Sequence, residues 1–171
     1  MSQRSSVTSA QVERMNRLFF GSDEYHGYGL DTVPGAVTAA KWEQHLKGEE
    51  SIGVNPRTSR GSCTWGAITT SYSRAKITAI CGKVPPSFIP CHGENGVNIF
   101  LFLDSPCSAS LVTKKMMLLA EYLELEEGTF EVYPKAGGMD WLLMPYFDHD
   151  KTAMFAVIEN VPQSINEFLK Y

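Results

Sequence analysis

Residues 93–106 read Gly-Glu-Asn-Gly-Val-Asn-Ile-Phe-Leu-Phe-Leu-Asp-Ser-Pro, and this stretch decides the fold that the sequence predicts. A Gly/Asn turn precedes an apolar run over 97–103, which only Asn98 interrupts and which Asp104-Ser105-Pro106 ends. A nearly continuous apolar run between turn residues is typical of a strand that is buried on both faces. We therefore expect a central strand over 97–103.

The segments around this strand alternate between strand and helix patterns. Residues 52–54, 62–70, 130–133 and 141–147 are β-rich, and residues 21–35 favour a loop or an irregular hairpin. Helices are expected from Gln11, over 37–46, 73–80 and 110–123, and from Ser164 through Leu169. In the helix over 110–123, the inward side chains are expected to be Leu111, Met117, Leu118 and Leu119. This order predicts an α+β or α/β sheet domain.

Length and charge limit the possible functions. A chain of 171 residues fits one domain, and we expect residues 11–171 to form it, preceded by a disordered, Ser/Thr-rich leader over 1–10. The net charge of −4 excludes a generally electropositive surface, so nucleic-acid binding would need a local basic patch. The most basic loop is 57–61, with Arg57 and Arg60, which either holds a phosphate or is an ordinary solvated loop.

Cysteine spacing and hydropathy predict the compartment. Cys63, Cys81, Cys91 and Cys107 form no C-x-x-C pair, which indicates reduced thiols in an intracellular protein. No apolar run approaches the roughly 20 residues of a membrane span. We expect a soluble protein of the cytoplasm or nucleus that has no membrane partner.

Several phrases occur in a recognisable order along residues 18–169. They are Trp42 with His45-Leu46 and Gly48, then the stretches 52–56, 65–68, 96–106, 130–135 and 141–147. In this order they resemble the primase-polymerase domains of the archaeo-eukaryotic primase superfamily, especially the branch found in phages, plasmids and conflict systems. The resemblance implies an RRM-like mixed or antiparallel sheet flanked by helices, with two-metal nucleotide transfer on one sheet face.

The acidic motif of that family is altered in this chain. The resemblance implies an acid-x-acid pair on the strand after Trp65-Gly66, but the matching positions are Thr69, Thr70 and Ser71. Mg²⁺ and Mn²⁺ take hard oxygen ligands, and neutral hydroxyls do not replace two negative charges at a divalent cation. The expectation is a catalytically degenerate domain with no metal cofactor.

Other family positions are changed or kept. Asn98 stands where the resemblance implies a phosphate-contacting histidine, and His92 is a candidate substitute from the preceding loop. Glu131 matches the third acidic position as a possible remnant, and Lys135 is placed to contact phosphate. The alternative is that Glu131 belongs to the polar face of a strand and Lys135 to a solvated loop.

Three functional hypotheses follow. The first is a degenerate primase-like domain of a replication, viral or mobile-element system that binds single-stranded nucleic acid or a nucleotide through Arg57, Arg60, Tyr72, Arg74, His92, Asn98 and Lys135. The second is a protein-interaction module, either a replication accessory subunit or a decoy of a host primase or defence factor. The third is an active, Mg²⁺- or Mn²⁺-dependent primase or polymerase with ligands rearranged among Glu94, Asp104 and Glu131.

Overall fold

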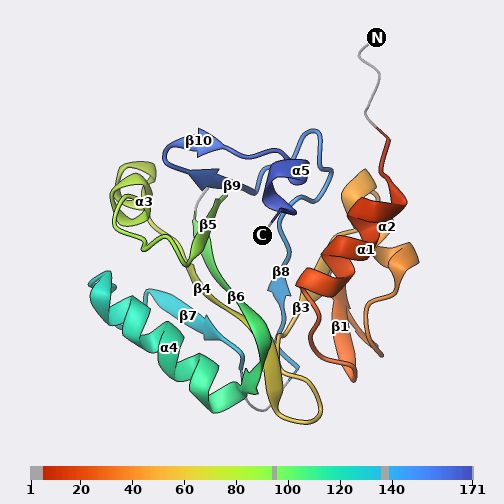
Figure 1. The fold of residues 1–171 in the computed structure, drawn as a ribbon, viewed down its shortest axis with the longest axis horizontal. Helices are drawn as coiled ribbons and strands as arrows, with labels where there is room; N and C mark the ends of the chain where they lie inside the picture. Colours follow the sequence, from red (N-terminus) through yellow and green to blue (C-terminus); the bar gives the residue numbers. More distant parts are fainter. Residues whose placement is uncertain (1–5, 94–95, 136–138, 171) are drawn as a thin grey trace.

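The computed structural model describes residues 6–93, 96–135 and 139–170, and within them five helices accompany two antiparallel sheets (Figure 1). The larger sheet has the strand order β10 (Val161–Pro162), β9 (Phe155–Ile158), β5 (Ile89–His92), β6 (Val97–Ser108), β4 (Ser62–Thr70) and β7 (Phe130–Tyr133). The smaller sheet has the order β2 (Asp31–Pro34), β1 (Tyr25–Tyr28), β3 (Ile52–Val54) and β8 (Leu142–Leu143). The predicted α+β class is confirmed.

The predicted central strand is β6, which pairs with β5 on one side and β4 on the other. It continues to Ser108, beyond the expected end at residue 103. The register shifts between Cys63 and Trp65 of β4, so Leu103 to Pro106 form a bulge opposite Thr64 before pairing resumes at Cys107. A bulge tolerates proline because it leaves residues out of the ladder, so Pro106 does not end the strand.

The segment β4–α3–β5–β6–α4–β7 has the split βαβ arrangement, in which each helix connects two strands that flank a third. Helices α3 (Arg74–Cys81) and α4 (Ala109–Tyr122) pack on one face of this sheet. Ile77 and Met116 from the helices meet Ile68 and Ile99 from the sheet in one core. This part of the structure is an antiparallel sheet flanked by helices, as expected.

The inner face of α4 differs from the prediction. Val112, Met116, Leu119 and Ala120 are buried, whereas Leu111, Met117 and Leu118 are exposed. The helix is apolar on both sides, so its hydrophobic periodicity in the sequence fits two orientations equally well. The side on which the sheet lies is set by tertiary packing.

The opposite face of the larger sheet is covered by an aromatic core. The ring of Phe19 makes edge contacts with Trp65 and Phe100 at centroid distances of 5.3 Å and stacks on Trp42. Helices α1 (Ser9–Leu18), α2 (Ala39–Lys47) and α5 (Ile165–Phe168) contribute to this core. The N-terminal segment therefore covers much of the face that the resemblance implied for catalysis.

The smaller sheet contains the expected hairpin, β1 with β2. Gly27 and Gly53 leave room for the Trp141 ring, because a Cβ atom at these positions would lie 2.4 and 2.1 Å from ring carbons. Strand β8 spans two residues instead of the expected 141–147, since Pro145 and Tyr146, the latter with a φ of 64°, turn the chain away.

Some element boundaries differ from the sequence-based expectations. Helix α1 begins at Ser9 with Thr8 as its N-cap, inside the expected disordered leader, whose residues 1–5 lie outside the described part. Strand β5 was not predicted. It contains Pro90, which pairs with Ile99 of β6 and lies outside the β5–β9 pairing at Cys91 and His92. The hairpin β9–β10 was also missed. No helix of the described chain is both long enough and apolar enough to cross a bilayer.

Candidate functional site

Three of the positions that the resemblance matches to the family's catalytic motifs form a row across three strands. Thr69 lies opposite Asn98 of β6 on one side and Glu131 of β7 on the other. Residues directly opposite one another share a sheet face, so these three side chains lie on the face away from α3 and α4. Thr70 points to the other face, where its hydroxyl donates to the Thr129 carbonyl at 2.8 Å. Ser71 follows the end of the strand and is exposed.

The chemistry of this row does not fit a two-metal centre. Asn98 is buried, and its Nδ2–H donates to the Met154 sulfur at 3.3 Å. Glu131 is exposed, and its carboxylate accepts from the Lys135 ammonium at 2.9 Å. The described residues contain no group of three or more Asp, Glu, His or Cys side chains placed to hold a metal ion. One carboxylate with a lysine partner is not the ligand set that Mg²⁺ requires.

The rearranged ligand set is not assembled either. Asp104 lies six residues along β6 from Asn98, which corresponds to about 20 Å at strand spacing, and Asn98 is in the row that contains Glu131. Glu94 lies outside the described residues. Asp104 and Glu131 are therefore not brought together.

His92 does not replace the missing histidine. Cys91 of β5 is opposite Asn98, so these two side chains share a face of the sheet. His92 follows Cys91 on β5, and its imidazole therefore points to the face opposite Asn98. Burial lowers the pKa of His92 below its usual value, which keeps the ring neutral at pH 7. Strand alternation therefore separates the His92 imidazole from the Asn98 side chain.

Arg57 and Lys135 are brought together at a small polar cleft of about 200 Å³. The buried Asn55 organises it, because its Nδ2 donates to the Tyr25 hydroxyl at 3.0 Å and to the Lys135 carbonyl at 3.1 Å. Sequence reasoning missed Asn55, whose only signal was its place before Pro56. Glu24 also lines the cleft, which reduces its attraction for anions.

The other predicted nucleic-acid contacts are dispersed. Arg60 is exposed in the loop before β4, where it helps to lower the pKa of Asp23 after the larger effect of hydrogen bonds from Ser59. Tyr72 lies just after the C-terminal end of the nine-residue strand β4, whereas Arg60 lies before its N-terminal end. The Tyr72 hydroxyl hydrogen-bonds the Thr129 hydroxyl. Arg74 begins α3, and its side chain lies outside the described part. The predicted set therefore does not form one surface.

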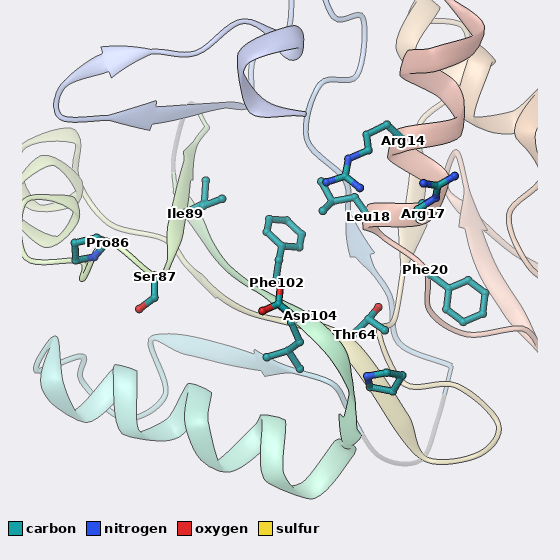
Figure 2. A pocket seen from close by; sticks show the side chains of 12 residues that line it. Arg14, Arg17, Leu18, Phe20, Thr64, Pro86, Ser87, Ile89, Phe102 and Asp104 are labelled. Atoms are coloured by element: carbon teal, nitrogen blue, oxygen red, sulfur yellow. The ribbon is translucent and has the colours of Figure 1, made fainter. Parts of the chain in front are cut away.

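A much larger groove, of about 800 Å³, lies between α1 and the strands β5 and β6 (Figure 2). Arg14 and Arg17 line it from α1, and Phe102 lines it from β6. Arg14 Nε donates to the Leu169 carbonyl at 3.2 Å, which fixes the base of its guanidinium at the groove. The remaining lining residues are Leu18, Phe20, Thr64, Pro86, Ser87, Ile89, Leu103, Asp104 and Pro106.

The groove combines cationic, aromatic and hydroxyl groups. The side chain of Arg17 is 68% exposed and pairs with Glu13 at 2.9 Å, an exposed ion pair that a phosphate can replace at little cost. Phe20 is 51% exposed, and Phe102 is stacked on Phe100. Thr64 Oγ1 is shielded from solvent and has no hydrogen-bond partner among the described residues. Guanidinium groups bind phosphates, and exposed rings stack on bases.

Local sequence patterns did not predict this groove. The sequence pattern predicts that Arg14 and Arg17 lie on the solvated face of an amphipathic helix and that Phe102 belongs to a buried strand. The spacing of three residues between the arginines does place both on one helix face. What lies opposite that face is a matter of tertiary structure.

Two other segments that contain histidine have structural contacts. His26 Nδ1 lies 2.7 Å from the Gly35 carbonyl, and its Nε2 lies 3.0 Å from Lys41 Nζ. Residues 148–150, Asp-His-Asp, form a turn that is anchored by the Asp148 amide donating to the His45 carbonyl.

No family model matches the chain, and no curated protein matches it. The function is therefore inferred from the chemistry of the groove and of the cross-strand row.

Proposed function

We propose that this protein binds single-stranded nucleic acid in the groove between α1 and β6, on a primase-polymerase-like scaffold that does not join nucleotides. The observation that carries the proposal is that two arginines and two aromatic rings line the same groove (Figure 2). They are Arg14, Arg17, Phe20 and Phe102. Proteins that bind single strands combine positive groups that contact the backbone with rings on which bases stack.

The absence of an acidic pair at Thr69 and Ser71 supports the second half of the proposal. Thr69 and Asn98, both neutral, are directly opposite one another on β4 and β6, and Glu131 forms an ion pair with Lys135. Without a carboxylate cluster, divalent cations are not held where they would activate a 3′-hydroxyl and neutralise a triphosphate. The domain is expected to bind nucleic acid without extending it.

The electrostatics predict moderate, salt-sensitive affinity. The net charge is −4 and Asp104 also lines the groove, so attraction depends on the two arginines. Each phosphate contact to a single strand releases about 0.7 counterion. Loss of both arginines should therefore reduce the slope of log affinity against log salt by about 1.4.

The test is fluorescence anisotropy with a labelled oligothymidylate at several salt concentrations. The double variant Arg14→Ala, Arg17→Ala is expected to lose at least about a hundredfold in affinity, since two charge-assisted contacts of on the order of 1.5–3 kcal/mol each are removed. The matched control Lys83→Ala, Lys151→Ala removes the same charge from exposed positions elsewhere and should bind normally. Equal losses in both variants would refute the groove as the site.

Two further measurements complete the test. Phe20→Leu keeps an apolar side chain but removes the ring, and it should weaken binding with little change in salt dependence. Incubation with Mg²⁺ or Mn²⁺, nucleotides and a single-stranded template should give no labelled product. Template-dependent incorporation would overturn the non-catalytic part of the proposal while leaving the groove untouched.

A second candidate function, a protein-interaction module of a replication or defence complex, is favoured by one observation. The outer face of α4 exposes Leu111, Met117, Leu118 and Tyr122. Contiguous exposed apolar side chains on a single element are typical of protein contacts. If the oligothymidylate does not bind at any salt concentration, this function replaces the first.

A further inference from the structure

Helix α4 presents an apolar stripe to solvent that its own domain does not cover. Its inner face carries the buried residues Val112, Met116, Leu119 and Ala120. On the other side, Leu111, Leu118 and Tyr122 are 45%, 57% and 63% exposed, and they recur at spacings of seven and four residues. Figure 1 shows α4 at the edge of the molecule, with the sheet on one side only. The stripe is therefore continuous along the helix.

Two charged residues on one flank of this stripe have a self-complementary order. Lys114 and Glu121 are seven residues apart, so they lie on the same side of the helix, close to the line of Leu118. Neither forms an ion pair with another described residue. Lys115 is also exposed, but it lies on the opposite flank of the stripe. The flank that carries Lys114 and Glu121 has its cation toward the N-terminal end and its anion toward the C-terminal end, so it complements a reversed copy of itself.

We propose that two copies of this chain associate through α4, with the two helices antiparallel and the twofold axis near Leu118. In this arrangement Lys114 of each copy meets Glu121 of the other, so that two equivalent ion pairs form. Leu111 of each copy meets Tyr122 of the other, and the two Leu118 side chains meet at the axis. An isologous interface needs such matching, because residue i must fit residue j in both directions.

A recess beside the helix supports close approach. A shallow groove of about 380 Å³ runs along α4 and is lined by Met117, Glu121, Leu125 and Phe130, among others. Met117 is 47% exposed at its edge, and methionine adapts to irregular surfaces. Like Glu121, Lys114 lines this groove. In the antiparallel pair the grooves of the two copies lie next to each other across the twofold axis, so side chains of each copy can fill part of the other's groove.

The length of helix α4 limits the expected affinity of the two copies for each other. Helix α4 has 14 residues, which at 1.5 Å per residue is about 21 Å of contact length. Stable interfaces bury roughly 800 Å² per partner, and a single short helix supplies less than that. The dimer should therefore be concentration-dependent, forming in the range of tens to hundreds of micromolar. This inference does not depend on nucleic-acid binding.

Sedimentation velocity over about 5 to 500 µM, a span of two decades around the expected dissociation constant, tests the proposal. The wild-type chain should shift from monomer to dimer, and Leu118→Asp should remain monomeric throughout. Leu30→Asp is the matched control, since Leu30 is 98% exposed in the turn between β1 and β2 and lies away from α4. Thermal melting should show that both variants fold. The proposal would be contradicted if the wild-type chain stayed monomeric at the highest concentration, or if the two variants changed self-association equally.

Charge reversal distinguishes this pairing from a general hydrophobic contact. Lys114→Glu alone and Glu121→Lys alone should each weaken self-association, because each places like charges opposite one another. Mixing these two single variants should restore a dimer that contains one copy of each, and the double variant Lys114→Glu, Glu121→Lys should self-associate like the wild type. Failure of both the mixture and the double variant would rule out the antiparallel register.

Discussion

Thr69 of β4 lies directly opposite Glu131 of β7, on the face of the larger sheet that lies away from α3 and α4. Replacing Thr69 with aspartate would put two carboxylates opposite one another, which destabilises an antiparallel pair by roughly 0.2–1 kcal/mol. We expect Thr69→Asp to lower the free energy of unfolding relative to the uncharged control Thr69→Asn. Millimolar Mn²⁺ should recover the difference in urea titrations of the aspartate variant only. Equal stability of the two variants would contradict the register-based expectation.

Cys63 and Cys107 are opposite one another across β4 and β6, and both are free thiols. Opposite residues in antiparallel strands have Cα atoms about 4.5–5.5 Å apart, which lies within the range of disulfides. Hydrogen peroxide should convert the two thiols to a disulfide, with the removed hydrogens and electrons reducing the peroxide to two waters. Burial raises the pKa of Cys63 to about 11, so the reaction should be slow at neutral pH.

Peptide mapping under non-reducing conditions checks this disulfide. Cys107→Ser should abolish the cross-linked peptide, while Cys81→Ser should leave it, because Cys81 lies on α3 and not opposite Cys63. A cross-linked peptide that joins other cysteines in the folded protein would contradict the pairing.

Gly53 is essential to the packing of the smaller sheet. A Cβ at this position would lie 2.1 Å from the Trp141 ring, so Gly53→Ala should cost about 1–3 kcal/mol through overpacking. Gly82→Ala is the control, since that residue has a helical φ of −64° at the end of α3 and its nearest neighbour would be 3.6 Å away. Chemical denaturation should show a lower midpoint for the first variant and an unchanged or higher midpoint for the second.

His45 connects α2 to two distant segments in its neutral form. The Ile52 amide donates to His45 Nδ1 at 3.0 Å, so Nε2 carries the proton and donates to the Pro145 carbonyl at 2.8 Å. Burial lowers the pKa of His45 from 6.5 to about 4. The unfolded chain therefore binds more protons between these values, and stability is complete above pH 6.5 and lost as the pH falls toward 4.

At pH 5 this effect should cost about 2 kcal/mol relative to pH 7, since each pKa unit corresponds to about 1.4 kcal/mol. His45→Gln keeps a donor and an acceptor but does not titrate, so it should show a weaker loss of unfolding free energy between pH 7 and pH 5. Burial also lowers the pKa of His26 and His92, and these contribute equally to both proteins. Identical pH dependence of variant and wild type would refute the role of His45.

Much of the secondary structure follows from local patterns. The strand over Ser62–Thr70 and the helix that begins after the Ser73 cap were predicted at their observed bounds or within one residue, because alternation and capping are local signals. The failures occur where partners are distant. Pro106 was expected to end the central strand, but the sheet places it in a bulge. Pro90 lies within β5, outside the β5–β9 pairing.

The chain itself determined which residue types stand at Thr69, Ser71 and Asn98, and therefore that the cross-strand row lacks the charge to hold divalent cations. Tertiary structure alone decided that Asn98 is buried, that His92 faces away from it, and that Arg14 lies across a groove from Phe102. The physical reason is that residue chemistry and periodicity act over a few residues. Register, burial and the walls of a groove instead depend on segments that meet only in the folded chain.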